Sequence, residues 1–224
     1  MVLGATGGIG SALVERLEAA RLFDAVVGLS RRSDPPVDVT DEDSIARAAR
    51  HVCQTGGELR LVLDASGFLH DQNFMPEKSW QQLDPAHLAK AFAVNATGPA
   101  LLMKHFLPLL ARRGRSVFAT LSARVGSIGD NRLGGWYSYR ASKAALNMLV
   151  RAASIELARQ NKAAICVALH PGTVDTRLSQ PFGKAGLQVR SPATAAVELL
   201  GVIDRLGPEH SGGFFDHHGE PVPW

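Results

Sequence analysis

A tyrosine and a lysine four residues apart are the first pair in the sequence that could do chemistry. Tyr139 and Lys143 lie near the start of a predicted helix, so their side chains share one face. A phenol with a pKa of ~10 is a poor acid–base catalyst at neutral pH. An ammonium about 4 Å away, at an effective dielectric of ~20, stabilises the phenolate by up to ~4 kcal/mol and brings the pKa near working pH. The alternative is a solvated or packed pair, because this spacing also arises by chance.

A glycine-rich turn precedes the first predicted helix. Gly4, Gly8 and Gly10 stand in the segment Gly-Ala-Thr-Gly-Gly-Ile-Gly, between a short apolar strand and a helix. A backbone that passes close to a pyrophosphate cannot carry side chains there, and the helix that follows presents free N–H groups to the phosphates. The turn therefore predicts a dinucleotide site, and a merely flexible turn is the alternative.

Two arginines end the second predicted strand. An acidic residue at this point would bind the ribose 2′-hydroxyl of NAD, whereas an arginine accommodates the 2′-phosphate of NADP. Arg31 and Arg32 stand here, and no acid appears before Asp34. The sequence therefore favours NADP(H) over NAD(H), against the alternative that both arginines are simply solvated.

Short apolar segments alternate with longer amphipathic ones, which predicts an α/β fold. Parallel strands joined by crossover helices form a doubly wound, mostly parallel sheet, here a Rossmann fold in one domain, 1–224. We expect strands at 1–3, 25–30, 37–39, 60–65, 116–121, 164–169 and 213–216. We expect helices at 11–21, 41–54, 85–113 with an interruption at 95–99, 138–160 and 192–205.

Composition excludes several classes of protein. Of the 224 residues, 46% are hydrophobic and 20% charged, as in an ordinary globular domain. The net charge of +3 is too small to indicate nucleic-acid binding. No apolar run reaches ~18 residues, so no membrane span is expected. Cys53 and Cys166 lack metal-site spacing and indicate free thiols in a reducing cytoplasm.

Several motifs in a fixed order resemble the short-chain dehydrogenase/reductase family, and the resemblance covers essentially the whole chain. The glycine turn and Tyr139-Arg-Ala-Ser-Lys143 carry it. The segments 122–126, 130–143, 170–176 and 211–216 are similar to those of the C-factor-like and sniffer-like carbonyl reductases. The resemblance implies an NADP-dependent oxidoreductase that transfers a hydride between nicotinamide and a carbonyl or alcohol substrate, with Tyr139 as general acid and base assisted by Lys143.

The resemblance also implies roles at matched positions. Asp38 matches an acid that contacts the adenine, and Thr176 matches a contact to the carboxamide. Asn95 matches a helix-interrupting asparagine whose backbone carbonyl holds a water for a proton relay; a kink without chemistry is the alternative. The expected catalytic residues are Asn95, Ser122, Tyr139 and Lys143. The expected cofactor contacts are Gly4, Thr6, Gly7, Gly8, Ile9, Gly10, Arg31, Arg32, Asp38, Val39, Ala65, Ser66, Gly67, Asn95, Tyr139, Lys143, Pro171, Gly172, Thr173, Val174 and Thr176.

The serine that would polarise the substrate carbonyl departs from the family pattern. Counting back from Gly126 places Ala123 at that position. Ser122 is one residue early and would point to the other face of an ideal strand, and Ser127 lies just past the glycine. We select Ser122, while Ser127, or water with Tyr139, could fill the role.

Other features name no ligand by themselves. His70, His217 and His218 lack zinc-site spacing, so no metal is expected and solvated or substrate-facing histidines are favoured. Residues 177–190 resemble a mobile segment over the substrate. Relatives often pair through two long helices, here around Leu101 and Leu146, which favours a homodimer or homotetramer.

A non-catalytic dinucleotide-binding signalling or sensor protein is the alternative function. An extended epimerase or dehydratase fits poorly, because the sequence shows no C-terminal substrate domain.

Overall fold

The computed structural model describes residues 1–182 and 189–224. Within them, one central sheet has the strand order β2-β1-β3-β4-β5-β8, with every neighbouring pair parallel. Such an order requires crossover connections, and helices provide them. The strands are Val2–Leu3 (β1), Gly28–Leu29 (β2), Leu61–Asp64 (β3), Ser116–Leu121 (β4), Ala164–His170 (β5) and Phe214–Asp216 (β8).

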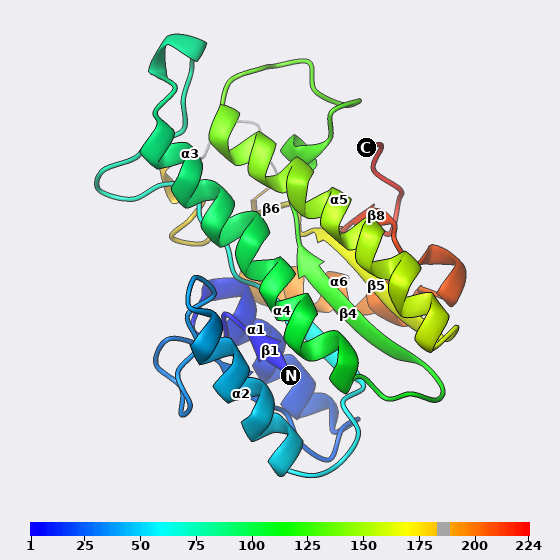
Figure 1. The fold of residues 1–224 in the computed structure, drawn as a ribbon. Helices are drawn as coiled ribbons and strands as arrows, with labels where there is room; N and C mark the ends of the chain where they lie inside the picture. Colours follow the sequence, from blue (N-terminus) through cyan, green and yellow to red (C-terminus); the bar gives the residue numbers. More distant parts are fainter. Residues whose placement is uncertain (183–188) are drawn as a thin grey trace.

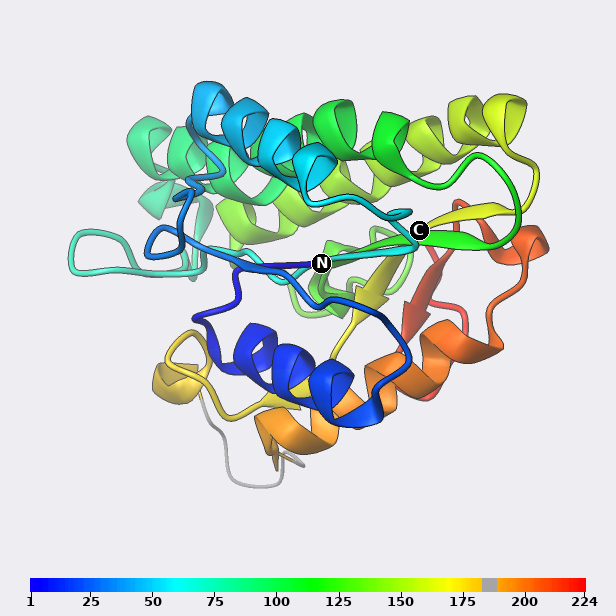
Figure 2. The ribbon, with the colours of Figure 1, turned by 90° about the horizontal axis from the view of Figure 1, so that it is seen from below.

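Helices cover both faces of the sheet (Figures 1 and 2). On one face lie α2 (Glu42–Gln54), α3 (Pro85–Phe92), α4 (Gly98–Phe106) and α5 (Tyr137–Gln160); on the other lie α1 (Gly8–Ala20) and α6 (Pro192–Arg205). The predicted doubly wound α/β fold in a single domain is therefore confirmed.

Apolar side chains from alternate positions of β4 and β5 fill two separate cores. Phe118 and Cys166 pack with Leu146 of α5 on one side of the sheet, whereas Val117 and Val167 belong to the cluster on the α1 and α6 side. Strands buried on both faces need apolar residues at every position, which explains their near-continuous apolar runs. The two cores fix the sheet and so fix the ends of its strands, where the site lies.

The second and third predicted strands differ from the structure. The strand expected at 25–30 is reduced to Gly28–Leu29. No strand forms at 37–39, so that prediction was wrong. After two prolines the chain turns back, and the Val37 N–H donates to the Ser30 carbonyl at 2.8 Å. Val37 is buried in the core, so its apolar character reflects packing and not a sheet position.

The long helical stretch predicted at 85–113 is divided, as its expected interruption required. A π-helical turn at Ala93–Thr97 separates α3 from α4. The stretch also ends earlier than predicted, since α4 stops at Phe106 and a 3₁₀ turn, Leu107–Leu109, follows. Pro108 has no N–H to donate to the carbonyl four residues earlier, so the α-helical hydrogen-bond pattern cannot continue through it.

A small ladder was missed by the sequence analysis. Strand β6 (Thr173–Val174) pairs in parallel with β7 (Val189–Arg190) beside the end of β5. Of the predicted mobile segment 177–190, residues 183–188 lie outside the described residues. In the part of the chain described, no helix has both the length and the apolar character needed to cross a membrane.

Candidate active site

The predicted site residues gather at one edge of the sheet. Because all strands are parallel, their carboxyl ends meet there, and ligands of doubly wound folds bind at that edge. The glycine turn follows β1, Asp64 ends β3, Ser122 follows β4 and His170 ends β5. Segments more than a hundred residues apart in sequence are thereby brought side by side.

Close packing of the backbone requires glycine at several positions of the turn. Gly4 has a φ of +73°, which favours glycine, and a Cβ on Gly4 would lie 2.9 Å from the Ala65 carbonyl. A Cβ on Gly10 would collide with the carbonyl oxygen of Gly4, and one on Gly8 would lie 2.9 Å from Thr176 Cγ2. The turn therefore packs closely against both the segment after β3 and the segment after β5.

The helix that follows the turn has an open N-terminus. Its N-cap residue, Gly7, provides no side-chain hydrogen bond, and Thr6, Gly7 and Gly8 are exposed. The first N–H groups of a helix have no partner within the helix and carry partial positive charge. The N-terminus of α1 can therefore bind an anionic group such as a pyrophosphate.

Positive charge lies next to the glycine turn. β2 neighbours β1, and Ser30 after β2 is buried while Arg31 and Arg32 are exposed. Asp38 accepts hydrogen bonds from the N–H and hydroxyl of Thr40, which lower its pKa, and the charge of Arg31 lowers it further. The Arg31 charge therefore acts on the Asp38 carboxylate.

Asp64 is a site residue that the sequence analysis missed. Its carboxylate is buried at the end of β3, where it accepts hydrogen bonds from Thr120 Oγ1 at 2.7 Å and from the Ser66 N–H at 3.0 Å. These bonds fix the predicted turn 65–67. An acid at the end of the apolar run Leu-Val-Leu was the available signal, because a buried carboxylate in such a strand needs partners.

Asn95 joins three segments at the π-helical turn. It is fully buried, and its Oδ1 accepts from the Phe68 N–H at 2.8 Å. Its Nδ2 donates to the Phe68 carbonyl at 2.7 Å and to Ser142 Oγ at 3.1 Å, and Ser142 Oγ donates to the Tyr139 carbonyl. The side-chain amide is fully used in these bonds, so Asn95 links the turn after β3 to the first turns of α5.

The tyrosine and the lysine lie together, as their spacing predicted. Tyr139 is 9% exposed and Lys143 3%. Lys143 Nζ donates to the Leu121 carbonyl at 2.7 Å and lies 6.0 Å from the centroid of the Tyr139 ring. The end of β4 therefore holds the ammonium beside the phenol.

Burial shifts the pKa values of both groups, an effect that the sequence analysis did not include. It raises the pKa of Tyr139 above its ordinary value. It lowers the pKa of Lys143 to about 8, an effect that the negative charge of Asp64 opposes. Burial therefore opposes the lowering of the Tyr139 pKa that we expect from Lys143, because removal from water disfavours the phenolate. The effect of Lys143 on this pKa stays a prediction.

The hydroxyls of both candidate serines already make hydrogen bonds to other groups of the chain. Ser122 is buried and its hydroxyl donates to Asn147 Oδ1 at 2.7 Å, one turn beyond Lys143 on α5. Ser127 is also buried, and its Oγ accepts from the Asp130 N–H at 3.0 Å. Ala123 is half-buried. The choice of Ser122 stays a prediction.

The segment after β5 returns to the glycine turn. Gly172 has a φ of +75° and lies against the ring of His217, and Thr176 packs at Gly8. Thr173 and Val174 form β6. The positions predicted to flank the nicotinamide therefore line the same edge as Tyr139.

Aromatic rings surround the approach to Tyr139, an arrangement that sequence reasoning did not identify. The Trp136 ring centroid lies 6.2 Å from that of Tyr139 and 5.1 Å from that of Phe182. His70 packs edge-on against Phe182 at 5.2 Å, and its Nε2 lies 3.3 Å from the Arg177 carbonyl. Trp136, His70 and Phe182 are each half-buried, so part of their ring surface remains available.

The sequence is similar to those of known oxidoreductases and of a signalling protein. A family model described as enoyl-(acyl carrier protein) reductase matches residues 4–203. C-signal of Myxococcus xanthus is 42% identical over 143 residues, which cover 63% of this chain and 81% of that protein. The 1-hydroxy-2-glutathionyl-2-methyl-3-butene dehydrogenase of Rhodococcus sp. (strain AD45) is 33% identical over 235 residues, covering 100% and 98%.

Two solved structures have the same fold. An NADPH-bound carbonyl reductase from chicken fatty liver superposes with a TM-score of 0.83 and 27% identity, covering 100% of this chain and 98% of that one. The carbonyl reductase Sniffer of D. melanogaster superposes with a TM-score of 0.82 and 22% identity, with the same coverage.

Proposed function

Because the chain belongs to the short-chain dehydrogenase/reductase family of oxidoreductases, we propose that it transfers a hydride between the nicotinamide of NADP(H) and a carbonyl or alcohol substrate. The observation that carries the proposal is the buried ammonium of Lys143, held by the Leu121 carbonyl 6.0 Å from the Tyr139 ring. A buried charge beside a phenol is costly unless it serves the stability of a nearby anion.

The residues present fit a dinucleotide. The open N-terminus of α1 and the glycines before it would hold the pyrophosphate, since side chains at Gly4 or Gly10 would clash with backbone. The segment 171–176 would flank the nicotinamide, and Ala65–Gly67 the middle of the cofactor. When bound, NADPH supplies the hydride.

Tyr139 then donates the proton to the carbonyl oxygen. Its raised pKa keeps the phenol protonated at neutral pH, which suits a proton donor in the reductive direction. The phenolate left behind is stabilised by the Lys143 ammonium, whose position the Leu121 carbonyl fixes. Since the side chain of Asn95 is occupied, any part of Asn95 in returning the proton belongs to its backbone carbonyl within the π-helical turn.

The rings around Tyr139 favour a neutral substrate with an apolar part. Trp136 and Phe182 offer half-buried aromatic surface beside the phenol, which binds apolar groups by burial and ring contact. A carboxylate placed against the faces of these rings would lose hydration and meet the negative face of each ring. We therefore expect aromatic or aliphatic ketones and aldehydes to react better than oxo acids.

A substrate panel with NADPH tests this function. We expect loss of nicotinamide absorbance with neutral aldehydes and ketones, and a kcat/KM at least about 10-fold lower for a matched compound that carries a carboxylate. Equal rates for the matched pair would contradict the substrate class. Tight NADPH binding without turnover on the whole panel would contradict the reaction itself.

The choice of NADP over NAD is a separate prediction. We expect Arg31→Ala together with Arg32→Ala to weaken NADPH binding by about 10- to 100-fold, the worth of one charge-assisted contact to phosphate, and to leave NADH binding almost unchanged. Isothermal titration measures both dissociation constants. Arg159→Ala, at the far end of α5, removes an exposed charge away from the site and is the control. An equal loss for both cofactors would contradict the role of these arginines.

A second candidate function comes from the relative named C-signal. A chain that binds the dinucleotide and signals without turnover would keep the glycine turn but have no need of Lys143 beside Tyr139. The pair therefore favours the enzyme, and the panel distinguishes the two functions.

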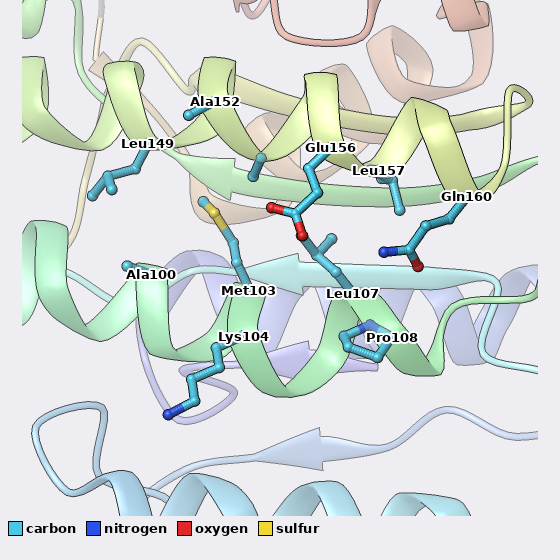
Figure 3. Close-up of a pocket in the computed structure, with 11 residues that line it drawn as sticks. Ala100, Met103, Lys104, Leu107, Pro108, Leu149, Ala152, Glu156, Leu157 and Gln160 are labelled. Atoms are coloured by element: carbon cyan, nitrogen blue, oxygen red, sulfur yellow. The ribbon is translucent and has the colours of Figure 1, made fainter.

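The expected homodimer or homotetramer, paired through the helices around Leu101 and Leu146, stays a prediction. Leu146 is fully buried in the core of the chain and cannot reach a second copy. Between the same two helices, α4 and α5, lies a groove with Met103, Leu107 and Leu149 along it (Figure 3). If a second copy pairs through these helices, we expect it to contact this groove.

A further inference from the structure

The helix that carries Tyr139 begins without a capping residue of its own. Trp136 precedes α5 with a φ of +52°, and its side chain makes no capping hydrogen bond. Gly134 and Gly135 before it also have positive φ values, so three consecutive residues lie in the left-handed region. A buried helix start needs partners for its free N–H groups, and this conformation needs a neighbour that maintains it.

Glu77, from the loop between β3 and α3, supplies those partners. Its Oε2 accepts from the Ser138 N–H at 3.2 Å, its Oε1 accepts from the Ser138 hydroxyl, and its backbone carbonyl accepts from the Trp136 N–H. The side chain is 2% exposed. A carboxylate at the N-terminus of a helix is also favoured by the helix dipole. Glu77 therefore acts as a cap for α5 from 61 residues away in sequence.

The carboxylate is itself held from the opposite side. His87 of α3 places its Nδ1 3.2 Å from Glu77 Oε1, and both side chains are buried. The imidazole stacks on Phe74 with ring centroids 4.9 Å apart and meets the edge of Phe68 at 6.0 Å. The Glu77 carboxylate is thus held between His87 and the first turn of α5.

From these contacts we propose that Glu77 is a positioning residue for the reaction, which sets the direction of the Tyr139 side chain by fixing the residue before it. The inference rests on the proposed function, because it concerns how well the proton donor is aimed. Glu77 does not reach the glycine turn or the phosphate end of the site through any of these bonds. Its effect therefore falls on the chemical step and not on cofactor binding.

Two substitutions at Glu77 test the proposal. Glu77→Gln keeps the shape and one acceptor but removes the charge, and Glu77→Ala removes the cap entirely. We expect kcat to fall about 10-fold in the first variant and about 100-fold in the second, with the NADPH dissociation constant within about threefold of the unaltered protein. We also expect a larger solvent deuterium isotope effect on kcat, since proton donation becomes slower.

A matched variant separates positioning from stability. Asp41 caps α2 by accepting from the Asp43 N–H at 3.0 Å, so Asp41→Ala removes a helix cap away from Tyr139. We expect it to lower the melting temperature and leave kcat and the isotope effect unchanged. If the Glu77 variants lose activity only in proportion to the fraction of unfolded protein, and the folded fraction keeps the kcat and isotope effect of the unaltered protein, Glu77 has only a structural role and the proposal fails.

Hydrogen exchange tests the positioning without any turnover. We expect the peptide amides at 136–142 to exchange at least about 10-fold faster in Glu77→Gln, and those of the second half of α5 to stay protected. Unchanged exchange at 136–142 would overturn the inference, even if activity were lost. Inactivity of the unaltered protein on the substrate panel would instead overturn the proposed function and leave this exchange result to decide the role of Glu77.

Discussion

Tyr139→Phe is expected to lower kcat by at least about 100-fold, and by up to about 10,000-fold, while NADPH still binds. The change removes only the hydroxyl, and the ring keeps its contact with Trp136. General acid catalysis contributes ~10²–10⁴-fold, so its loss raises the barrier by ~3–5 kcal/mol. Stopped-flow nicotinamide absorbance measures the chemical step, and fluorescence of bound NADPH measures the dissociation constant.

Tyr137→Phe is the control for the general effect of removing a tyrosine hydroxyl near the start of α5. Tyr137→Phe makes the same chemical change two residues earlier, on a half-buried side chain. We expect it to retain nearly full activity. Undiminished turnover in Tyr139→Phe would remove Tyr139 as the proton donor, whatever the Tyr137 variant does.

Lys143→Met is expected to lower kcat by about 100-fold. Nζ lies 6.0 Å from the centroid of the Tyr139 ring. For two charges separated by roughly this distance, at an effective dielectric of ~20, the attraction is ~3 kcal/mol, which we take as the stabilisation of the phenolate. That energy corresponds to ~100-fold in rate. Lys143→Arg keeps the charge in a different shape and should lose less, provided that the protein still binds NADPH. A Met variant that is as active as the unaltered protein would contradict the electrostatic role.

The same lysine predicts the pH dependence of the reaction. Burial lowers its pKa to about 8, so the ammonium is present below that pH and is lost as the pH rises through it. We therefore expect kcat/KM for NADPH, which reports the free enzyme, to fall above pH ~8. Asp64→Asn should move this fall to lower pH, because the carboxylate of Asp64 raises the Lys143 pKa. Lys143→Met should not show the fall, and its persistence there would assign the titration to another group.

Local patterns predicted most of the fold and the proximity of Tyr139 and Lys143. The glycine turn, the Tyr139–Lys143 spacing and the interruption near Asn95 depend on residues close in sequence, and the structure places each as expected. The strand expected at 37–39 failed because Val37 is apolar for core packing, and the sequence does not tell core contact from strand pairing.

The parts of the site that were missed depend on contacts between distant segments. Glu77 meets Ser138 across 61 residues, and Thr120 meets Asp64 across 56. No spacing in the sequence encodes those pairs. Burial raises the Tyr139 pKa, and the sequence analysis left this effect out because burial is a property of the packed structure, whereas the charge of Lys143 was visible in the sequence.

Transfer of deuterium is the most direct test of the proposed reaction. The unaltered protein would be mixed with NADPH deuterated on each face of the nicotinamide C4 in turn and with a neutral ketone, and the product analysed by mass spectrometry. We expect one deuterium at the former carbonyl carbon from one of the two labelled cofactors only, as a fixed site beside Tyr139 requires. Bound NADPH that delivers no deuterium to any carbonyl compound tested would contradict hydride transfer and leave a dinucleotide-binding protein.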